Sequence, residues 1–263
     1  MDLGLRDKIV LVTGGAKGIG LGVAQVLAAE GAIPVIVGRN AADNAAAVQE
    51  IVAQGGQAWG VAAELNQTAD CRRAVEHTVA QWGRIDGLVN NAGVNDGVNL
   101  EDGDTEQFLA SLRKNLIHYY EMAHFALPEL KKSRGAIVNV GSKVAETGQG
   151  GTSAYAAANG GRNALTREWA VELAKYHIRV NAVIVAECWT PMYASWLATV
   201  PDPEATRAQI EARIPFEHRM TTCTEIANMV AFLLSAKSSH TTGQLIHVDG
   251  GYVHLDRSVS ALS

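Results

Sequence analysis

The sequence predicts an α/β protein built on one parallel sheet that is covered by helices on both faces. Seven short runs of apolar, mostly β-branched residues alternate with longer helical segments, as in a doubly wound sheet. The runs are almost continuously apolar, which is typical of strands buried on both faces. We expect these strands at 8–13, 33–38, 58–63, 85–90, 135–141, 178–186 and 244–250.

Length and composition indicate one domain that spans residues 1–263. The formal net charge of -5 provides no basic field for a phosphate backbone, so nucleic acid is not an expected partner. The N-terminus lacks an apolar signal segment, and no apolar stretch approaches the ~18 residues of a membrane span. We therefore expect a cytoplasmic protein without a membrane partner.

The cysteines and histidines show no metal-binding or disulfide spacing. Cys71, Cys188 and Cys223 are odd in number, far apart in sequence and without a C-x-x-C pair, which predicts neither a disulfide framework nor a zinc site. The eight histidines include no H-x-x-x-H pair. We expect no metal ion and a reducing compartment.

One segment interrupts the alternation of strands and helices. Between the sixth and seventh expected strands, residues 190–222 contain four prolines, at positions 191, 201, 203 and 215. This insertion follows the carboxyl end of a parallel strand, where ligands bind in open α/β sheets. We expect a small helical lid over the substrate.

A glycine-rich turn joins the first strand to the following helix. Residues 13–20 read TGGAKGIG, in which Gly14, Gly18 and Gly20 have the spacing G-x-x-x-G-x-G. Glycine permits a tight turn and a close approach of the backbone, and a helix N-terminus offers free N–H groups to a pyrophosphate. The turn, with a strand before it and a helix after it, predicts a dinucleotide site.

The end of the second strand favours NADP over NAD. No acid is present there to bind the ribose 2′-hydroxyl; Arg39 follows Gly38, and a guanidinium suits a 2′-phosphate. Lys17 adds a second cation. If Arg39 is only a solvated surface residue, NAD is also possible. Glu64, followed by Leu65, either caps the adenine amine or is a carboxylate that precedes the next helix.

The ordered motifs resemble the classical short-chain dehydrogenase/reductase family over nearly the whole chain. The resemblance rests on the glycine loop, Asn90–Gly93, Asn115, Ser142, Tyr155 and Asp249–Gly251. It implies a single Rossmann-like seven-stranded sheet of order 3-2-1-4-5-6-7. It also implies a homotetramer built on the helices around 105–131 and 152–176.

The resemblance assigns a role to each matching residue. Tyr155 would be the general acid/base during hydride transfer with the nicotinamide, Ser142 would hydrogen-bond the substrate oxygen, and Asn115 would hold a water in the proton relay. The implied cofactor-binding residues are Gly14, Lys17, Gly18, Ile19, Gly20, Arg39, Glu64, Leu65, Asn91, Ala92, Gly93, Tyr155, Asn159 and Thr190.

Position 159 departs from the family, which has lysine four residues after the tyrosine. Asn159 keeps a hydrogen-bond donor for the ribose but provides no positive charge to activate the phenol of Tyr155. Two nearby cations, Lys143 and Arg162, are candidates to supply the missing positive charge. Strand alternation directs Lys143 away from Ser142, and we expect Arg162 to be solvated at the surface.

A second departure follows the sixth strand, where the chain reads AECWTP. Glu187 and Trp189 in this segment suit a polyhydroxylated ligand, because a carboxylate accepts from sugar hydroxyls and an indole stacks on C–H faces. In the alternative, nearby backbone groups hydrogen-bond the carboxylate of Glu187, and Trp189 packs under the lid. The other polar residues that we expect at this sheet edge are Asn95, Asp96, Glu146 and Gln149.

This polar segment resembles the bacterial L-fucose dehydrogenase-type branch of the family. The resemblance implies oxidation of an aldose such as L-fucose at C1 to the lactone. Two alternatives remain open: reduction of a ketone such as a 3-oxoacyl thioester or a steroid, and a non-catalytic dinucleotide-binding protein that has lost the family lysine at position 159. The acidic net charge disfavours acidic acyl-carrier partners.

Overall fold

The computed structural model describes residues 2–255. Its centre is a seven-stranded sheet with the strand order β3-β2-β1-β4-β5-β6-β7. Every neighbouring pair of strands is parallel. Each strand overlaps the run that predicts it, so the predicted fold class and strand order are confirmed. The strands are β1 (Ile9–Thr13), β2 (Ile33–Gly38), β3 (Trp59–Ala62), β4 (Gly87–Asn90), β5 (Ala136–Ser142), β6 (Arg179–Val185) and β7 (Leu245–Val248).

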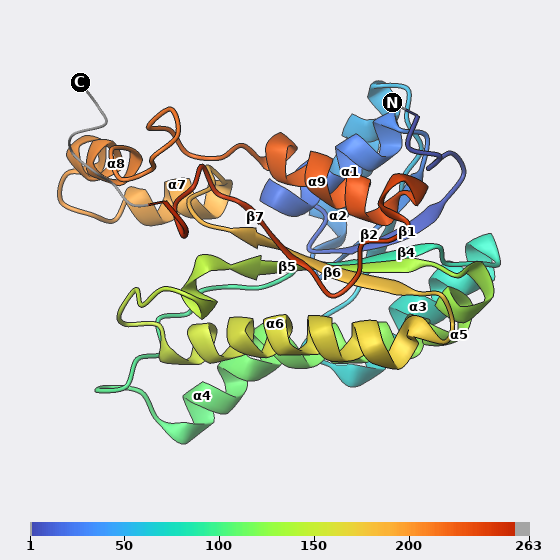
Figure 1. Ribbon diagram of the computed structural model, residues 1–263, viewed down its shortest axis with the longest axis horizontal. Coiled ribbons are helices and arrows are strands. Elements are labelled where there is room, and N and C mark those ends of the chain that lie inside the picture. The colour runs from blue at the N-terminus through green and yellow to red at the C-terminus, as the bar shows by residue number, and fades with distance from the viewer. Residues whose placement is uncertain (1, 256–263) are drawn as a thin grey trace.

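Helices cover both faces of the sheet (Figure 1). One layer contains α1 (Gly18–Ala29), α2 (Ala41–Ala53) and α9 (Cys223–Leu234). The other contains α3 (Thr68–Trp82), α4 (Thr105–Leu112), α5 (His118–Ser133) and α6 (Ser153–Ala174).

The core explains why the strands read as continuous apolar runs. Leu11 belongs to the apolar cluster on one side of the sheet, and its neighbours Val10 and Val12 belong to the cluster on the other side. Successive side chains of a strand point to opposite faces, so a sheet covered on both faces needs apolar residues at every position.

The order of the strands reverses between β1 and β4, because the chain runs outward from β1 to β3 and then returns to the other side of β1. The loops after these two strands contain the glycine-rich turn and Asn91–Gly93. Such a switch point opens a crevice at the carboxyl ends of the strands, which is where dinucleotides bind in this class of sheet.

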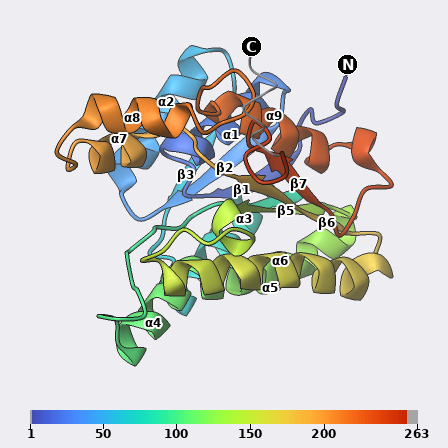
Figure 2. The ribbon, with the colours of Figure 1, turned by 60° about the vertical axis from the view of Figure 1, so that its left-hand side comes forward.

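Residues 190–222 include two short helices, α7 (Pro191–Leu197) and α8 (Pro203–Glu211), beyond the carboxyl end of β6 (Figures 1 and 2). Pro191 and Pro203 each begin a helix, and Thr190 and Asp202 provide the N-caps. The closing motion of a lid stays a prediction.

Three shorter helical turns complete the described chain: η1, a π-helix (Arg113–Ile117), η2 (Lys143–Ala145) and η3 (Ala236–Ser238). Pro128 lies inside α5, which continues to Ser133. Within residues 2–255, no helix is long and apolar enough to span a bilayer. The family resemblance also implies that the C-terminal tail contacts a neighbouring subunit, and residues 256–263 of this tail lie outside the described residues.

Candidate active site

The glycine-rich turn has the geometry of a dinucleotide cradle. Gly14 and Gly18 have φ of +64° and +54°, in the left-handed region that favours glycine. A Cβ at Gly20 would lie 2.1 Å from the carbonyl oxygen of Gly14, so no larger residue fits. Helix α1 begins here, and Lys17 at its N-cap offers no capping side chain. The first N–H groups are therefore available to a pyrophosphate, and the residues present fit the group.

The structure brings other predicted cofactor residues against this turn. Asn91 donates from Nδ2 to the carbonyl oxygen of Thr13 at 2.9 Å. A Cβ on Gly14 would lie 3.1 Å from Cα of Ala92, and one on Gly18 would lie 3.4 Å from Cβ of Thr190. Segments after β1, β4 and β6 therefore border one site.

The two cations predicted to contact a 2′-phosphate differ in their environment. Arg39 is exposed and makes no ion pair with any described residue. Lys17 forms an ion pair with Asp43 of α2, with 2.7 Å between Nζ and Oδ2. Glu64 accepts from the backbone N–H of Asn66 at 3.1 Å, as expected for a carboxylate that precedes a helix. Its role toward adenine stays a prediction.

Ser142 ends β5, and Tyr155 lies in the first turn of α6, which packs against η2 directly after Ser142. The Ser142 hydroxyl accepts from the N–H of Val144 at 3.4 Å. Tyr155 is half-buried, and its hydroxyl makes no hydrogen bond with a described residue. That hydroxyl is available to a substrate oxygen.

Asn115 is fully buried in the π-helix η1. Its Oδ1 accepts from the N–H of Val94 at 2.8 Å, and its Nδ2 donates to the carbonyl oxygen of Ser111 at 3.0 Å. Its own carbonyl oxygen accepts from Nε of Arg162 at 2.7 Å. These contacts tie the loop after β4 to α6, and binding of a relay water by Asn115 stays a prediction.

The expectation that Arg162 is solvated is wrong. Its side chain is 3% exposed, and Asn159 beside it is completely buried. Residues three apart share a helix face, and this face of α6 packs against β5 and η1. Nη1 of Arg162 donates to Oδ1 of Asn159 at 3.0 Å. Position 159 therefore lies directly beside a buried cation.

Lys143 is also buried, and it forms an ion pair with Glu187. It begins η2 and is no longer part of the strand, so the argument from strand alternation does not apply. Its Nζ lies 4.0 Å from the centre of the Tyr252 ring. Tyr193 of α7 donates to the other oxygen of Glu187 at 2.9 Å. Burial, and then the charge of Glu187, raise the pKa of Tyr193 and keep it a donor.

Trp189 lies just before α7 and is 40% exposed. The guanidinium of Arg207 from α8 lies 4.3 Å from the centre of its ring. Gln149 and Asn95 are exposed on loops at this edge of the sheet. Oδ2 of Asp96 instead lies 3.3 Å from Nζ of Lys114, and Oδ1 accepts a hydrogen bond from the Ser111 hydroxyl at 2.7 Å. Both carboxylate oxygens of Asp96 are therefore already bonded to residues of the segment 111–114.

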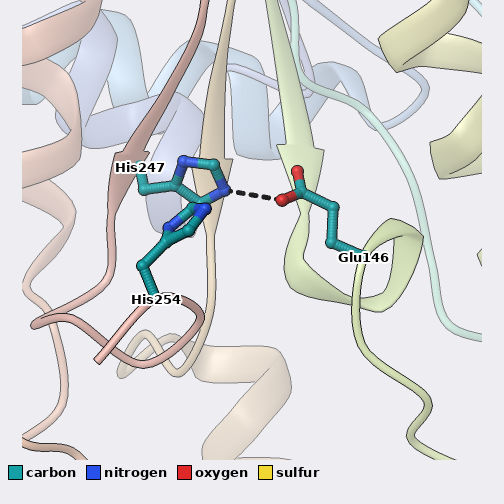
Figure 3. A group of neighbouring side chains, drawn as sticks. All are labelled: Glu146, His247 and His254. Atoms are coloured by element: carbon teal, nitrogen blue, oxygen red, sulfur yellow. Dashed lines mark hydrogen bonds and ion pairs between the residues drawn. The ribbon is translucent and has the colours of Figure 1, made fainter. Parts of the chain in front are cut away.

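Sequence reasoning missed two histidines that meet Glu146 (Figure 3). His247 of β7 lies 3.0 Å from a carboxylate oxygen of Glu146, and the ring of His254 packs edge-on against His247 with centroids 4.3 Å apart. One donor atom from each of the three residues lies within 4.8 Å of the others. A search for H-x-x-x-H spacing cannot find residues that only the fold brings together. The position of His247 at the carboxyl end of the last predicted strand was the available signal.

Comparisons with known proteins agree with this geometry. Residues 14–253 match the family described as "Enoyl-(Acyl carrier protein) reductase". The chain is 33% identical to bovine L-fucose dehydrogenase, over 95% of this chain and 92% of the relative. It is 37% identical to 3-oxoacyl-[acyl-carrier-protein] reductase of Thermotoga maritima, over 95% and 99% respectively.

A solved structure shows the same fold and a similar sequence. The crystal structure of Cj0485 dehydrogenase superposes with a TM-score of 0.93 at 42% identity, covering 98% of this chain and 99% of that one. The cofactor cradle, the sheet order and these relatives lead to one conclusion: the chain belongs to the short-chain dehydrogenase/reductase family and is an NAD(P)-dependent oxidoreductase that acts on CH–OH groups.

Proposed function

We propose that the protein oxidises an aldose, L-fucose or a related sugar, at C1 to the lactone. The observation that carries the proposal is the polar and aromatic lining at the carboxyl ends of β5, β6 and β7, where Glu146 and His247 face each other and Trp189 is half-exposed. Such a lining suits several hydroxyl groups and one C–H face. The similarity to bovine L-fucose dehydrogenase supports the same substrate class.

Tyr155 is the acid/base in this proposal. The phenolate oxygen of Tyr155 takes the proton of the C1 hydroxyl and becomes the phenol, while Ser142 hydrogen-bonds the same substrate oxygen, so the C–O bond can become a carbonyl as the C1 hydride leaves. The nicotinamide, when bound, supplies the acceptor for the C1 hydride. An anomeric hydroxyl is more acidic than an ordinary secondary alcohol and therefore demands a weaker base.

The preferred cofactor in this proposal is NADP, with NAD possible. Arg39 is exposed beyond the end of β2 without an acid partner among the described residues, and no carboxylate follows this strand directly. A guanidinium there favours a 2′-phosphate. Lys17 contributes less, because Asp43 neutralises part of its charge.

The proposed assembly is a cytoplasmic homotetramer. Apolar side chains are exposed on α4, α5 and α6, at Leu109, Tyr120 and Val171. Light scattering of the purified chain measures the mass, and a monomer would contradict this part of the proposal.

The experiment that tests the activity mixes the protein with NADP or NAD and a panel of aldoses, and follows the absorbance of the reduced cofactor. We expect turnover with L-fucose or a related aldose, faster with NADP, and lactone as the product. The same preparation is tested in the reverse direction on a 3-oxoacyl thioester, because the Thermotoga maritima relative carries that name. Reduction of the thioester without aldose oxidation would contradict the proposal and show that the protein is a ketone reductase. Cofactor binding without any turnover would leave a non-catalytic protein.

Changing His247→Ala should raise KM for the aldose roughly 10- to 100-fold and leave kcat nearly unchanged, because it removes a hydrogen bond made equally to substrate and transition state. Steady-state kinetics measure both constants, with the exposed His240→Ala as the matched control.

The donor set of Glu146, His247 and His254 also suits a divalent cation. Activity that persists in EDTA supports direct contact with sugar hydroxyls, and a loss restored by zinc contradicts it.

A further inference from the structure

Arg162 is a buried cation with no acidic partner among residues 2–255. A guanidinium removed from water without a carboxylate is costly, and proteins rarely retain one without a reason. Its position on α6 lies seven residues after Tyr155 and three after Asn159. The family resemblance does not account for it, because the expected lysine belongs at position 159.

Neutral groups hold the guanidinium in place. It donates to the carbonyl oxygens of Asn115 at 2.7 Å and Val140 at 3.2 Å, and to Oδ1 of Asn159 at 3.0 Å. Its central carbon lies 4.2 Å from the centre of the Tyr119 ring. These contacts orient the group and leave its charge uncompensated.

The guanidinium faces the proposed reaction site. Its central carbon lies 6.0 Å from the centre of the Tyr155 ring. Nη2 is buried and has no hydrogen-bond partner among the described residues. A Cβ at Gly93 would lie 2.8 Å from that nitrogen, which places it against the loop after β4. An unused donor and a charge without a carboxylate therefore lie near the Tyr155 ring and against the loop that contains the predicted cofactor residue Gly93.

The other ionisable groups on the elements packed around α6 do not supply this charge. Burial, and then the charge of Arg162, lower the pKa of His118 to about 3, so its imidazole is neutral. Burial raises the pKa of Tyr119 and keeps it neutral as well. Lys143 is paired with Glu187, and Glu146 with His247. The exposed Arg113 and Lys114 of η1 are paired with Glu121 and Asp96. Among the described residues of η1, η2 and α6, Arg162 is therefore the buried cation that lacks a paired carboxylate.

We propose that Arg162 replaces the missing lysine by stabilising the phenolate form of Tyr155, and that Asn159 holds the guanidinium in the required orientation. The inference rests on the proposed function for its catalytic consequence. Arg162 is a positioning residue that acts through Tyr155, and Asn159 is the small neutral residue that leaves space for it. The exchange moves the cation from position 159 to position 162 on the same helix face.

The proposal predicts an unusual result for the family residue. Asn159→Lys alone places a second cation where Oδ1 of Asn159 now accepts a hydrogen bond from Arg162. Repulsion between the two cations should lower the activity and the stability of the protein. Arg162→Met should lower kcat/KM near neutral pH roughly 10- to 100-fold and shift the rise in rate to higher pH, because the phenolate loses its positive neighbour. The double change Asn159→Lys with Arg162→Met restores one cation and should regain much of the lost activity.

Asn159→Asp separates charge from packing. It preserves the size of the side chain and the bond to Nη1 and neutralises the guanidinium, and it loses the hydrogen bond from Nδ2 of Asn159 to the carbonyl oxygen of Tyr155 at 2.9 Å. The pH–rate profile of the folded variant should shift upward. Arg167→Met removes an exposed cation from the same helix and should change neither the profile nor the rate. Thermal denaturation shows which variants remain folded.

A titration without cofactor or substrate tests the inference even if no aldose is oxidised. The near-ultraviolet absorbance of tyrosinate is followed against pH, and subtraction of the Tyr155→Phe curve isolates Tyr155. We expect this titration to move to higher pH in Arg162→Met and Asn159→Asp, and to stay in place in Arg167→Met. An unchanged titration and pH–rate profile in folded Arg162→Met or Asn159→Asp would overturn the role of Arg162. A shifted titration with no turnover on any aldose would instead overturn only the proposed function.

Discussion

Replacement of Tyr155 by phenylalanine is expected to lower kcat for the aldose by about 10²- to 10⁴-fold, the usual contribution of a positioned acid/base. The change removes only a hydroxyl that makes no hydrogen bond with a described residue, so the free energy of unfolding should hardly change. The dissociation constant for NADP, measured by calorimetry, should stay within a few-fold of the wild-type value.

Tyr176→Phe is the matched control for this experiment. Tyr176 follows the C-terminal end of α6, whereas Tyr155 lies in the first turn of that helix, and its replacement should leave kcat unchanged. If Tyr155→Phe retained activity within a few-fold of the wild type, another group would be the acid/base. The assignment of Tyr155 would then be wrong.

The second large effect concerns the buried ion pair of Lys143 and Glu187. Lys143→Met leaves the carboxylate of Glu187 in a largely buried position without its cation, while Tyr193 still donates to it. Breaking one partner of a buried pair costs about 3–5 kcal/mol, so chemical denaturation should show a loss of that order in the free energy of unfolding. The activity should also fall, because the pair joins η2 to the segment between β6 and the lid helix α7.

The double change Lys143→Met with Glu187→Gln separates the ion pair from the packing. It removes both charges together, so it should be more stable than Lys143→Met alone. The exposed pair of Arg207 and Glu211 on α8 provides the control, since surface pairs contribute about 0–1 kcal/mol. Additive losses in the double-mutant cycle would show that Lys143 and Glu187 do not depend on each other.

The sequence was sufficient for the fold because the information was local and periodic. Each apolar run was long enough for one strand, and each glycine of the cofactor turn had a position that only glycine fits, as Gly20 does. The order of motifs then identified the residues at the carboxyl ends of the strands. These inferences needed no knowledge of which segments pack together.

Helix α6 shows where that reasoning ended. Its buried residues include Asn159, Arg162 and Thr166 as well as Trp169 and Leu173, so its inner face is a mixture of polar and apolar side chains. A polar residue on such a helix is normally assigned to solvent, which is why the burial of Arg162 was not predicted. Lys143 was misjudged for a similar reason, because its direction depends on where β5 ends and η2 begins.

The sequence alone thus determined the family fold, the glycine cradle and the candidates for hydride transfer chemistry, since each depends on residues close together along the chain. Only the tertiary structure decided the placement of the charges. It brought Glu146 to His247 across about a hundred residues of chain, Lys143 to Glu187, and Arg162 to the Tyr155 ring. Electrostatic interactions depend on distance and burial in three dimensions, and neither can be read from the spacing of residues along the chain.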